Sequence, residues 1–425
     1  MKFGIYTLGC KVNAYESEFI SSLLQNHGYI KQDFDDLNDI YIINTCSVTN
    51  QSDVKSRKMI RSAIKKNPNA CIIAMGCFTE SARDEAPEGI SILLGNKDKS
   101  KILELLDEYF KDKKPIIRFY DGFHTEFEDM EIKTFGDKTR AFVKIQDGCE
   151  NYCTYCIIPY VRGKCRSKNP KKVIEEITNL VSNGYKEVVL TGIHTGNYGV
   201  DLDYPFYKLL KDIVEIPGLE RLRISSIEIT ELNDEVLKLL KEEKVIVDHL
   251  HIPLQSGSKK ILKLMNRKYD KKYFKDKIDV IRSIRPNISI TTDVIVGFPN
   301  EEDNDFLECL DFCKEINFSK IHVFPYSKRE GTPAAKMNNQ VNGIIKKERV
   351  KKLLELSKEL EYSYMKKFLN KKIEVLIEEN TDGYSYGHSG NYLNIKVDGT
   401  YKKGDIILVN TYKIEDTYLC GKETK

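Results

Sequence analysis

The feature that most constrains this chain of 425 residues is a group of three cysteines in its middle. Cys149, Cys153 and Cys156 form a C-x3-C-x2-C pattern within QDGCENYCTYCIIPYVRGKC. Chance alone would produce this pattern only about 0.01 times at this cysteine content. The chain has 11 cysteines, an odd number, and its first residues lack the apolar core of a signal peptide. We therefore expect a cytoplasmic protein whose cysteines serve metal binding or catalysis rather than disulfides.

Iron and sulfur suit this cysteine group better than zinc does. Zinc takes four ligands, usually in paired sets, and Cys165 lies nine residues beyond Cys156, an unusual gap for a fourth ligand. Three thiolates suit a [4Fe-4S] cluster that leaves one iron open for a substrate. The spacing therefore favours an iron–sulfur site over zinc or free thiols.

A second set of cysteines stands at the ends of three short apolar runs. FGIYTLGC ends at Cys10, IYIINTC at Cys46 and CIIAMGC at Cys77, and helix-like sequence follows each run. Such buried strands form parallel α/β sheets, in which ligands bind at the carboxyl ends of the strands. The three cysteines are therefore expected to converge on a second cluster site. The alternative is three buried, inert thiols, which are common in protein cores.

The order of strands and helices predicts an α/β protein. Residues 1–112 indicate a small doubly wound parallel-sheet domain, and the polar, irregular stretch 113–138 indicates a linker. The expected elements of the first domain are strands near 2–8, 40–45, 70–75 and 90–94 and helices near 14–27, 51–66 and 98–111. From residue 139, six strand–helix units predict a partial TIM-like barrel with its active site at the carboxyl ends of the strands.

The last part of the chain combines a long basic helix with an all-β tail. Residues 341–368 form the expected helix, and four turn signals after residue 379 predict a small barrel at the C-terminal end. No apolar run reaches 18 residues, so no membrane span is expected.

Any contact with nucleic acid has to come from local patches, because the chain carries 67 basic and 64 acidic residues. Residues 341–372 carry ten basic and four acidic side chains, which suits phosphates but equally suits a solvated helix face. The tail also offers aromatic side chains that stack on bases or fill the core of the barrel. They are Tyr384, Tyr386, His388, Tyr392, Tyr401 and Tyr412.

The segment GCENYCTYCIIPYVRG resembles the signature of radical S-adenosylmethionine (SAM) enzymes. With Cys10, Cys46 and Cys77 before it and a small β-barrel after it, the whole chain resembles the methylthiotransferases. The resemblance implies an N-terminal cluster-binding domain at 1–112, a linker at 113–138, a (β/α)6 radical SAM core at 139–368 and an OB-like TRAM domain that binds RNA at 369–425. It also implies that both cysteine trios are cluster ligands and catalytic residues.

The segment TLGCKVNAYES narrows the resemblance to one branch of the family. Lys11, Val12 and Asn13 are similar to the branch that acts on N6-threonylcarbamoyladenosine in tRNA, and TCSVTNQSDVKSR fits the same branch. Alternatives are the same chemistry on isopentenyladenosine tRNA or a ribosomal protein, another radical SAM reaction with an auxiliary cluster, and a non-catalytic iron–sulfur protein that binds RNA or carries electrons. The expected barrel argues against the last alternative, because a carrier needs no large substrate cavity.

The resemblance implies a reaction and its cofactors. A methylthio group is transferred to C2 of the modified adenosine at position 37 of tRNA, by SAM-dependent methylation of cluster sulfur and a 5′-deoxyadenosyl radical. Two [4Fe-4S] clusters and SAM are the implied cofactors. The implied partners are tRNA, a reducing protein such as flavodoxin or ferredoxin, and a sulfur donor.

Candidate SAM contacts follow from the ends of the predicted barrel strands and from Tyr155, where the family commonly has an aromatic residue near the adenine. They are Tyr155, Thr191, Gly192, Ser225, Ser226, Glu228, Gln255, Ser256, Gly257, Asp293 and residues 297–299. Each is also a common turn or cap residue. Arg162 and Arg166 are candidates for a SAM carboxylate or an RNA phosphate, or form a solvated basic turn.

The remaining cysteines are expected to be inert. Cys165 stands where the family often has a charged or small polar residue, and Cys71 lies at the opposite end of its strand from Cys77. Cys309 and Cys313 share one face of an amphipathic helix and are expected in the core.

Overall fold

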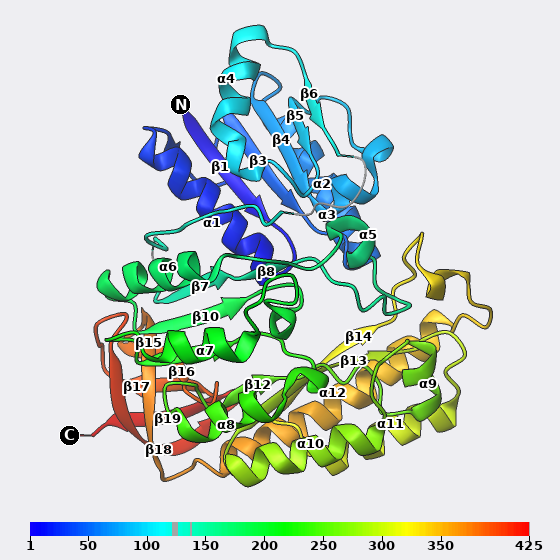
Figure 1. Ribbon diagram of the computed structural model, residues 1–425, viewed down its shortest axis with the longest axis vertical. Helices are drawn as coiled ribbons and strands as arrows, with labels where there is room; N and C mark the ends of the chain where they lie inside the picture. Colours follow the sequence, from blue (N-terminus) through cyan, green and yellow to red (C-terminus); the bar gives the residue numbers. More distant parts are fainter. Residues whose placement is uncertain (121–125, 137, 425) are drawn as a thin grey trace.

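The computed structural model describes residues 1–120, 126–136 and 138–424. Three bodies follow one another along the chain (Figure 1). An α/β sheet domain stands at the top, an open barrel of strands and helices forms the centre, and a small β-barrel lies against the lower part of the centre. The predicted fold class is confirmed.

The N-terminal domain is a parallel six-stranded sheet in the order β2-β1-β3-β4-β5-β6. Its strands are β1 (Lys2–Thr7), β2 (Ile30–Lys31), β3 (Ile40–Thr45), β4 (Cys71–Gly76), β5 (Ile92–Leu94) and β6 (Ile116–Arg118). Its helices are α1 (Lys11–Asn26), α2 (Asn50–Lys66), α3 (Cys77–Ser81) and α4 (Ile102–Asp112), with 3₁₀ turns η1 (Arg83–Glu85) and η2 (Lys99–Lys101).

This sheet is apolar on both faces, which explains why its strands are continuous apolar runs rather than alternating ones. Along β3, Ile40 and Ile42 join a cluster that includes Ile20 of α1. Tyr41 and Ile43 join a separate cluster that includes Ile60 of α2. Helices therefore cover both sides of the sheet, as the doubly wound prediction requires.

The predicted linker is more ordered than its polar composition suggests. Residues 116–118 form β6, which pairs in parallel with β5 at the edge of the sheet. Residues 121–125 and 137 of this predicted linker lie outside the described residues.

The central body is an open half-barrel of parallel strands. Sheets β11-β10-β7 and β12-β13-β14 meet through the bridges Leu222↔Ile246 and Ser226↔His251. The strands are β7 (Arg140–Lys144), β10 (Glu187–Thr191), β11 (Arg221–Ile224), β12 (His249–His251), β13 (Ser289–Val296) and β14 (Lys320–Pro325). A short antiparallel pair, β8 (Gln146–Asp147) and β9 (Arg166–Ser167), stands beside β7.

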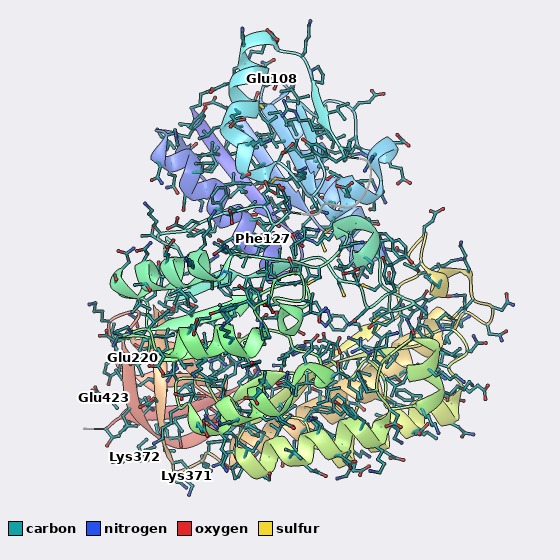
Figure 2. The ribbon with its side chains drawn as sticks, in the orientation of Figure 1. Glu108, Phe127, Glu220, Lys371, Lys372 and Glu423 are labelled. Atoms are coloured by element: carbon teal, nitrogen blue, oxygen red, sulfur yellow. The ribbon has the colours of Figure 1, made fainter. Side chains whose placement is uncertain are left out.

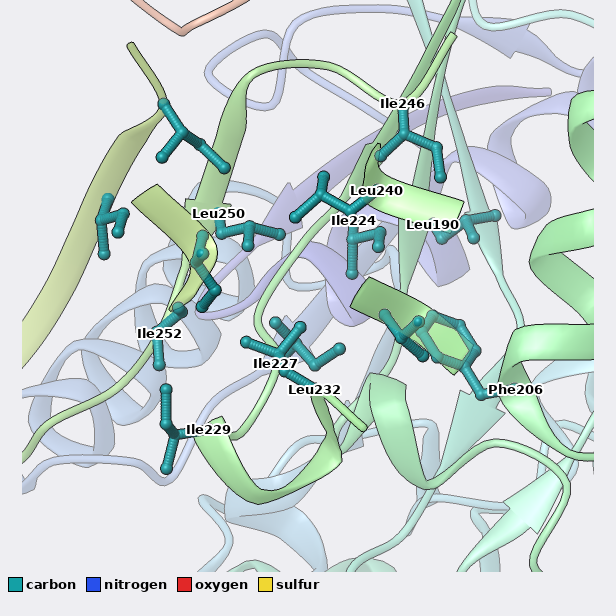
Figure 3. Packing of buried hydrophobic residues seen from close by; sticks show 14 of the residues in the cluster. Leu190, Phe206, Ile224, Ile227, Ile229, Leu232, Leu240, Ile246, Leu250 and Ile252 are labelled. Atoms are coloured by element: carbon teal, nitrogen blue, oxygen red, sulfur yellow. The ribbon is translucent and has the colours of Figure 1, made fainter. Parts of the chain in front are cut away.

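Helices pack around the outside of this half-barrel. They are α6 (Pro170–Ser182), α7 (Phe206–Val214), α8 (Asp234–Glu242), α9 (Lys259–Leu264), α10 (Lys271–Ile284), α11 (Asp303–Ile316) and α12 (Gly343–Lys366), with 3₁₀ turns η3 (Thr195–Asn197), η4 (Ile229–Glu231) and η5 (Pro333–Lys336). Figure 3 shows their packing: Leu190 and Ile224 of the strands meet Phe206 of α7 and Leu240 of α8 in one buried cluster. The short helix α5 (Ile158–Arg162) packs instead against α3 of the N-terminal domain.

The C-terminal body is a closed barrel in the order β15-β16-β17-β19-β18. Its strands are β15 (Lys372–Thr381), β16 (Tyr384–Ser389), β17 (Asn394–Asp398), β18 (Ile406–Glu415) and β19 (Tyr418–Glu423). Asp382 and Gly383 join β15 to β16 with φ angles of 52° and 81°, as a two-residue type I′ hairpin loop requires. Tyr364 and Met365 of α12 complete its apolar core.

Side chains join the three bodies. Phe127 lies where the N-terminal domain meets the centre (Figure 2), and the ammonium of Lys144 is 5.5 Å from its ring centroid. Arg140 Nε is 2.9 Å from Glu378 Oε1 of the C-terminal barrel. None of the helices in the described part of the chain combines the length and the apolar character that a membrane span needs.

Candidate active site

The first cysteine trio lies in a loop that is held at both ends. The loop follows β8 and runs into α5. The amide of Cys149 donates to the carbonyl of Gly163 at 3.0 Å, and the amide of Thr154 donates to the carbonyl of Met265 at 3.1 Å. Thr154 Oγ1 also donates to the carbonyl of Leu264 at 2.7 Å. These bonds gather Cys149, Cys153 and Cys156 at the carboxyl ends of the barrel strands.

Two basic side chains point at this trio, and neither was predicted from the sequence. Arg267 donates from Nη1 to Cys153 Sγ at 3.3 Å and forms an ion pair with Glu228. His194 Nδ1 is 3.7 Å from Cys149 Sγ. His194 follows the strand-end residues Thr191 and Gly192, so its sequence position could have marked it as a site residue. Arg267 lies in a loop between α9 and α10, and its sequence position gives no such indication.

Burial and hydrogen bonds shift the pKa values of Cys156 and His194. Burial raises the pKa of Cys156 to about 12, and the neighbouring Cys153 and Cys149 add to the shift. Burial lowers the pKa of His194, but hydrogen bonds with Cys149 and Glu231 outweigh it and bring the value to about 10. Thiols of this kind become thiolates when a metal binds and displaces their protons.

The second trio assembles at the carboxyl edge of the N-terminal sheet. Cys10 is the N-cap of α1, Cys46 directly follows β3, and Cys77 is the first residue of α3. A Cβ atom on Gly9 would lie 2.7 Å from Cys46 Sγ, so this sulfur sits directly against the loop that carries Cys10. Burial raises the pKa of Cys46 to about 11, with contributions from Cys77 and Cys10.

Arg162, which follows the loop of the first trio along the chain, contacts the second trio. It lies at the end of α5, and its Nε donates to Cys77 Sγ at 3.4 Å. Its Nη2 donates to Asn13 Oδ1 at 2.7 Å, and its Nη1 donates to Asp147 at 3.0 Å and to Glu16 at 3.2 Å. Arg162 is 1% exposed, so the predicted solvated turn and the phosphate contact are both wrong for it.

Arg166 is also buried rather than solvated. Its Nη1 donates to the carbonyls of Arg162 and Lys164 at 2.7 and 2.9 Å. It therefore holds the turn after α5 and is not placed to meet RNA.

A cavity of about 220 Å³ lies beside Cys156. Tyr155, Gln255 and Asp293, all predicted SAM contacts, line it. Ile295, Phe324, Tyr326 and neighbouring residues make most of its wall apolar.

A larger cavity of about 710 Å³ runs from Cys10 down the inside of the half-barrel. Thr191, Gly192, Ser226 and Asp293 of the predicted set line it. Asp293 and Phe324 border both cavities, so the spaces next to the two cysteine trios adjoin each other. Glu228 borders neither of these two cavities and instead pairs with Arg267.

The other cysteines are buried, and Cys165 lies close to Cys149 of the first trio. Cys71 belongs to the core of the N-terminal domain, and Cys309 and Cys313 belong to the core of the half-barrel. Cys165 Sγ accepts from Gln146 Nε2 at 3.1 Å, and burial raises the pKa of this thiol to about 12.

Both trios fit a [4Fe-4S] cluster better than a single metal ion. In the described part of the chain, no three His, Cys, Asp or Glu side chains converge on one metal position. A [4Fe-4S] cluster binds each thiolate through a different iron, so its ligands surround a volume rather than a point. One thiol of each trio lines a cavity, Cys156 in the first and Cys10 in the second. One thiol of each trio also receives a donor from an arginine, Cys153 from Arg267 and Cys77 from Arg162, which matches that requirement.

Comparisons with known proteins agree with this geometry. The Radical SAM superfamily model matches residues 143–313, and the model of the Uncharacterized protein family UPF0004 matches residues 2–94. Threonylcarbamoyladenosine tRNA methylthiotransferase MtaB of Bacillus subtilis (strain 168) is 44% identical, over 98% of this chain and 95% of that protein. The tRNA-2-methylthio-N(6)-dimethylallyladenosine synthase of Thermoanaerobacter sp. (strain X514) is 36% identical, over 88% and 82%.

The solved structure of the radical SAM methyltransferase TsrM from Kitasatospora setae, with cobalamin and a [4Fe-4S] cluster bound, shares the fold. Its TM-score is 0.58 at 13% identity, over 78% of this chain and 76% of that one.

The fold and the site define a radical SAM enzyme, which uses SAM and [4Fe-4S] chemistry. Within that class, the chain belongs to the methylthiotransferase family, because the similarity to its curated members extends over nearly the whole chain. The resemblance inferred from the sequence is confirmed.

Proposed function

We propose that this enzyme transfers a methylthio group to C2 of N6-threonylcarbamoyladenosine at position 37 of tRNA. The observation that carries the proposal is that one cysteine of each trio, Cys156 and Cys10, lines one of two adjoining cavities. A sulfur centre and a radical centre have to reach the same base, and two open cavities with a common border provide that geometry. The substrate follows the Bacillus subtilis relative, at 44% identity against 36% for the dimethylallyl relative.

Cys149, Cys153 and Cys156 would hold one [4Fe-4S] cluster, and Cys10, Cys46 and Cys77 the other. When bound, the clusters and SAM supply the radical and the transferable sulfur. The chain itself provides ligands, orientation and exclusion of water. Arg267 and Arg162 donate hydrogen bonds to Cys153 and Cys77, which orients each ligand.

The smaller cavity is the proposed SAM site. Tyr155, with Phe324 and Tyr326, gives it the apolar wall that suits an adenine ring, and Gln255 and Asp293 provide polar contacts. Thr191, Gly192 and Ser226 line the larger cavity and would face the side of SAM that points to the substrate. Glu228 would act on the site through Arg267, whose guanidinium it orients.

The domain roles follow the same proposal. Residues 1–112 would bind the second cluster, 139–368 would form the radical SAM core after the linker 113–138, and 369–425 would act as the TRAM domain that binds tRNA. The exposed aromatic rings Tyr384 and Tyr412 are available to stack on bases.

A flavodoxin or ferredoxin is the proposed reductant, and a sulfur donor renews the second cluster. Since tRNA is the substrate, we place the reaction in the cytoplasm.

Nucleoside mass spectrometry of tRNA from cells without this gene tests the substrate. We expect threonylcarbamoyladenosine to accumulate and its 2-methylthio form to disappear, and we expect a plasmid copy to restore that form. A copy with Cys149→Ala is the matched control and should fail to restore it. Persistence of the modification, with loss of the methylthio form of dimethylallyladenosine, would assign the enzyme to the other substrate.

Iron content tests the assignment of the two trios. Cys149→Ala and Cys10→Ala are each expected to lose about half of the bound iron after anaerobic reconstitution, because each removes a ligand of one cluster only. Cys309→Ala is the matched control, since Cys309 is buried in the core, and it should keep the full amount. Loss of iron in only one of the two ligand variants would leave a single-cluster enzyme.

A further inference from the structure

The inner end of the larger cavity is strongly basic. Lys11 lines this cavity together with Tyr392 and His249. Arg140 Nη1 donates to the hydroxyl of Tyr392 at 3.3 Å, and the guanidinium of Arg223 lies 4.6 Å from the centroid of the same ring. Three basic side chains therefore surround one tyrosine at the wall of the cavity.

The pKa values of two neighbouring side chains, Tyr392 and His249, shift in the direction that nearby positive charges produce. Burial raises the pKa of Tyr392, yet Arg140, Lys11 and Arg223 outweigh it and bring the pKa below its ordinary value. Burial lowers the pKa of His249 well below its ordinary value, and Arg223 adds to that effect. Both shifts favour the less positive form of each side chain.

Protein carboxylates do not satisfy all of these donors. Glu187 accepts from Arg223 Nε at 2.7 Å, and Glu378 pairs with Arg140. In the described part of the chain, Nη1 and Nη2 of Arg223 have no hydrogen-bond acceptor, although this side chain is 1% exposed. A buried donor without an acceptor is costly, so native structures usually provide one, and a ligand is one source.

Lys11 is the cation that a ligand can reach. Its side chain is exposed to the cavity, and no described residue accepts a hydrogen bond from it or pairs with it. Lys320 lines the same cavity and differs in this respect, because its ammonium is 2.8 Å from Glu361 Oε1. The basic end therefore presents an unpaired ammonium to whatever occupies the cavity.

We propose that Lys11, supported by the positive charges of Arg140 and Arg223, binds the carboxylate of the threonylcarbamoyl group and thereby selects the substrate. This inference rests on the proposed function. The position of Lys11 in the sequence supports this subsite, because Lys11 directly follows Cys10, a proposed ligand of the sulfur-donating cluster. C2 and N6 of adenine lie on the same edge of the base on either side of N1, so a substituent on N6 lies close to the atom that receives sulfur.

The same arrangement disfavours a dimethylallyl group. That group is apolar and offers no acceptor, so it would desolvate the ammonium of Lys11 without compensation. A carboxylate gains a charge-assisted hydrogen bond at the same place. Lys11 thus discriminates between the two substrates in two ways. Its ammonium attracts the carboxylate of the threonylcarbamoyl group, and burying that ammonium against a dimethylallyl group is costly.

Binding of modified anticodon stem-loops to the reconstituted enzyme tests this subsite. One RNA carries threonylcarbamoyladenosine, and a second carries the same group with its carboxylate replaced by a primary amide. We expect the wild-type enzyme to bind the carboxylate RNA about 10- to 100-fold more tightly, the usual effect of a hydrogen bond to a charged group. Fluorescence anisotropy without added reductant measures this ratio independently of turnover.

Three variants separate recognition from structure. Lys11→Met should bind both RNAs equally, Lys11→Arg should keep the preference, and Lys320→Met should also keep it because Lys320 is already paired. Iron content of Lys11→Met should equal that of the wild type, which shows that the adjacent cluster site is intact.

The outcomes distinguish this inference from the proposed function. Equal binding of the two RNAs by the wild type, or an unchanged preference in Lys11→Met, would overturn the subsite and leave the substrate assignment standing. Preference of the wild type for a dimethylallyladenosine stem-loop over the threonylcarbamoyladenosine one would overturn both.

Discussion

Replacing Arg162 with alanine is expected to lower the free energy of unfolding by about 3–5 kcal/mol, the usual cost of removing one partner from a buried ion pair. The guanidinium of Arg162 lies between carboxylates from two domains: Glu16 of α1 at 3.2 Å and Asp147 of β8 at 3.0 Å. Both carboxylates are buried. Removing the arginine leaves their charges with fewer counterions in a place that water does not reach.

The loss is partial because other cations remain. Lys144 contacts Glu16 at 2.9 Å and Asp147 at 2.7 Å, and Lys99 also pairs with Glu16. Arg162 first, and then Lys144 and Arg166, hold the pKa of Asp147 well below its ordinary value even though burial alone would raise it. Two of these three cations remain in the variant. The variant therefore still folds at neutral pH, with a weakened junction between the N-terminal domain and the half-barrel.

Urea denaturation of the apo-protein, followed by circular dichroism, measures this effect. Arg118→Ala is the matched control, because Arg118 forms an ion pair of 2.7 Å with Glu108, an exposed residue of α4 (Figure 2). A surface pair of this kind contributes about 0–1 kcal/mol. Equal shifts in the two variants would show that the buried network adds nothing beyond an ordinary surface contact.

The fold was predictable where local patterns determine it. The apolar runs that end at Cys10, Cys46 and Cys77 became β1, β3 and β4, since a strand buried on both faces needs a continuous apolar sequence. Strand β6 was not predicted, because three residues at a sheet edge leave little periodicity within a polar segment. Helix α1 begins at Lys11, three residues before the predicted start, because Cys10 occupies its N-cap.

The surroundings of the site were less predictable because they depend on distant partners. Arg162 looked like part of a basic turn, and its burial follows only from Glu16, which is 146 residues earlier in the chain. Arg267 pairs with Glu228 across 39 residues, so Arg267 had no local signal for its place beside Cys153, although the strand-end position of Glu228 marked that residue as a candidate. Spacing therefore identified the candidate ligands, whereas the groups that orient them required the tertiary structure.

Replacing Gly148 with alanine is expected to remove the radical SAM cluster and about half of the bound iron. Gly148 precedes Cys149 and has a φ of 77°, a conformation that costs an L-residue roughly 1–2 kcal/mol. An added Cβ atom would lie 1.9 Å from the carbonyl oxygen of Lys164 and 2.7 Å from that of Gly163. Both obstacles are backbone atoms, so the loop itself has to move.

Movement of this loop separates the ligands of one cluster and spares the other. The carbonyl of Gly163 also accepts the amide of Cys149, so the clash acts on the bond that positions this ligand. Iron analysis and electron paramagnetic resonance of the reconstituted protein should show one remaining cluster, held by Cys10, Cys46 and Cys77. Gly343→Ala is the matched control, since a Cβ there meets no atom within 4 Å at the start of α12, and it should keep all the iron. Full iron content in Gly148→Ala would mean that the geometry of this loop does not determine cluster binding, because the cysteines would then hold the cluster from a displaced backbone.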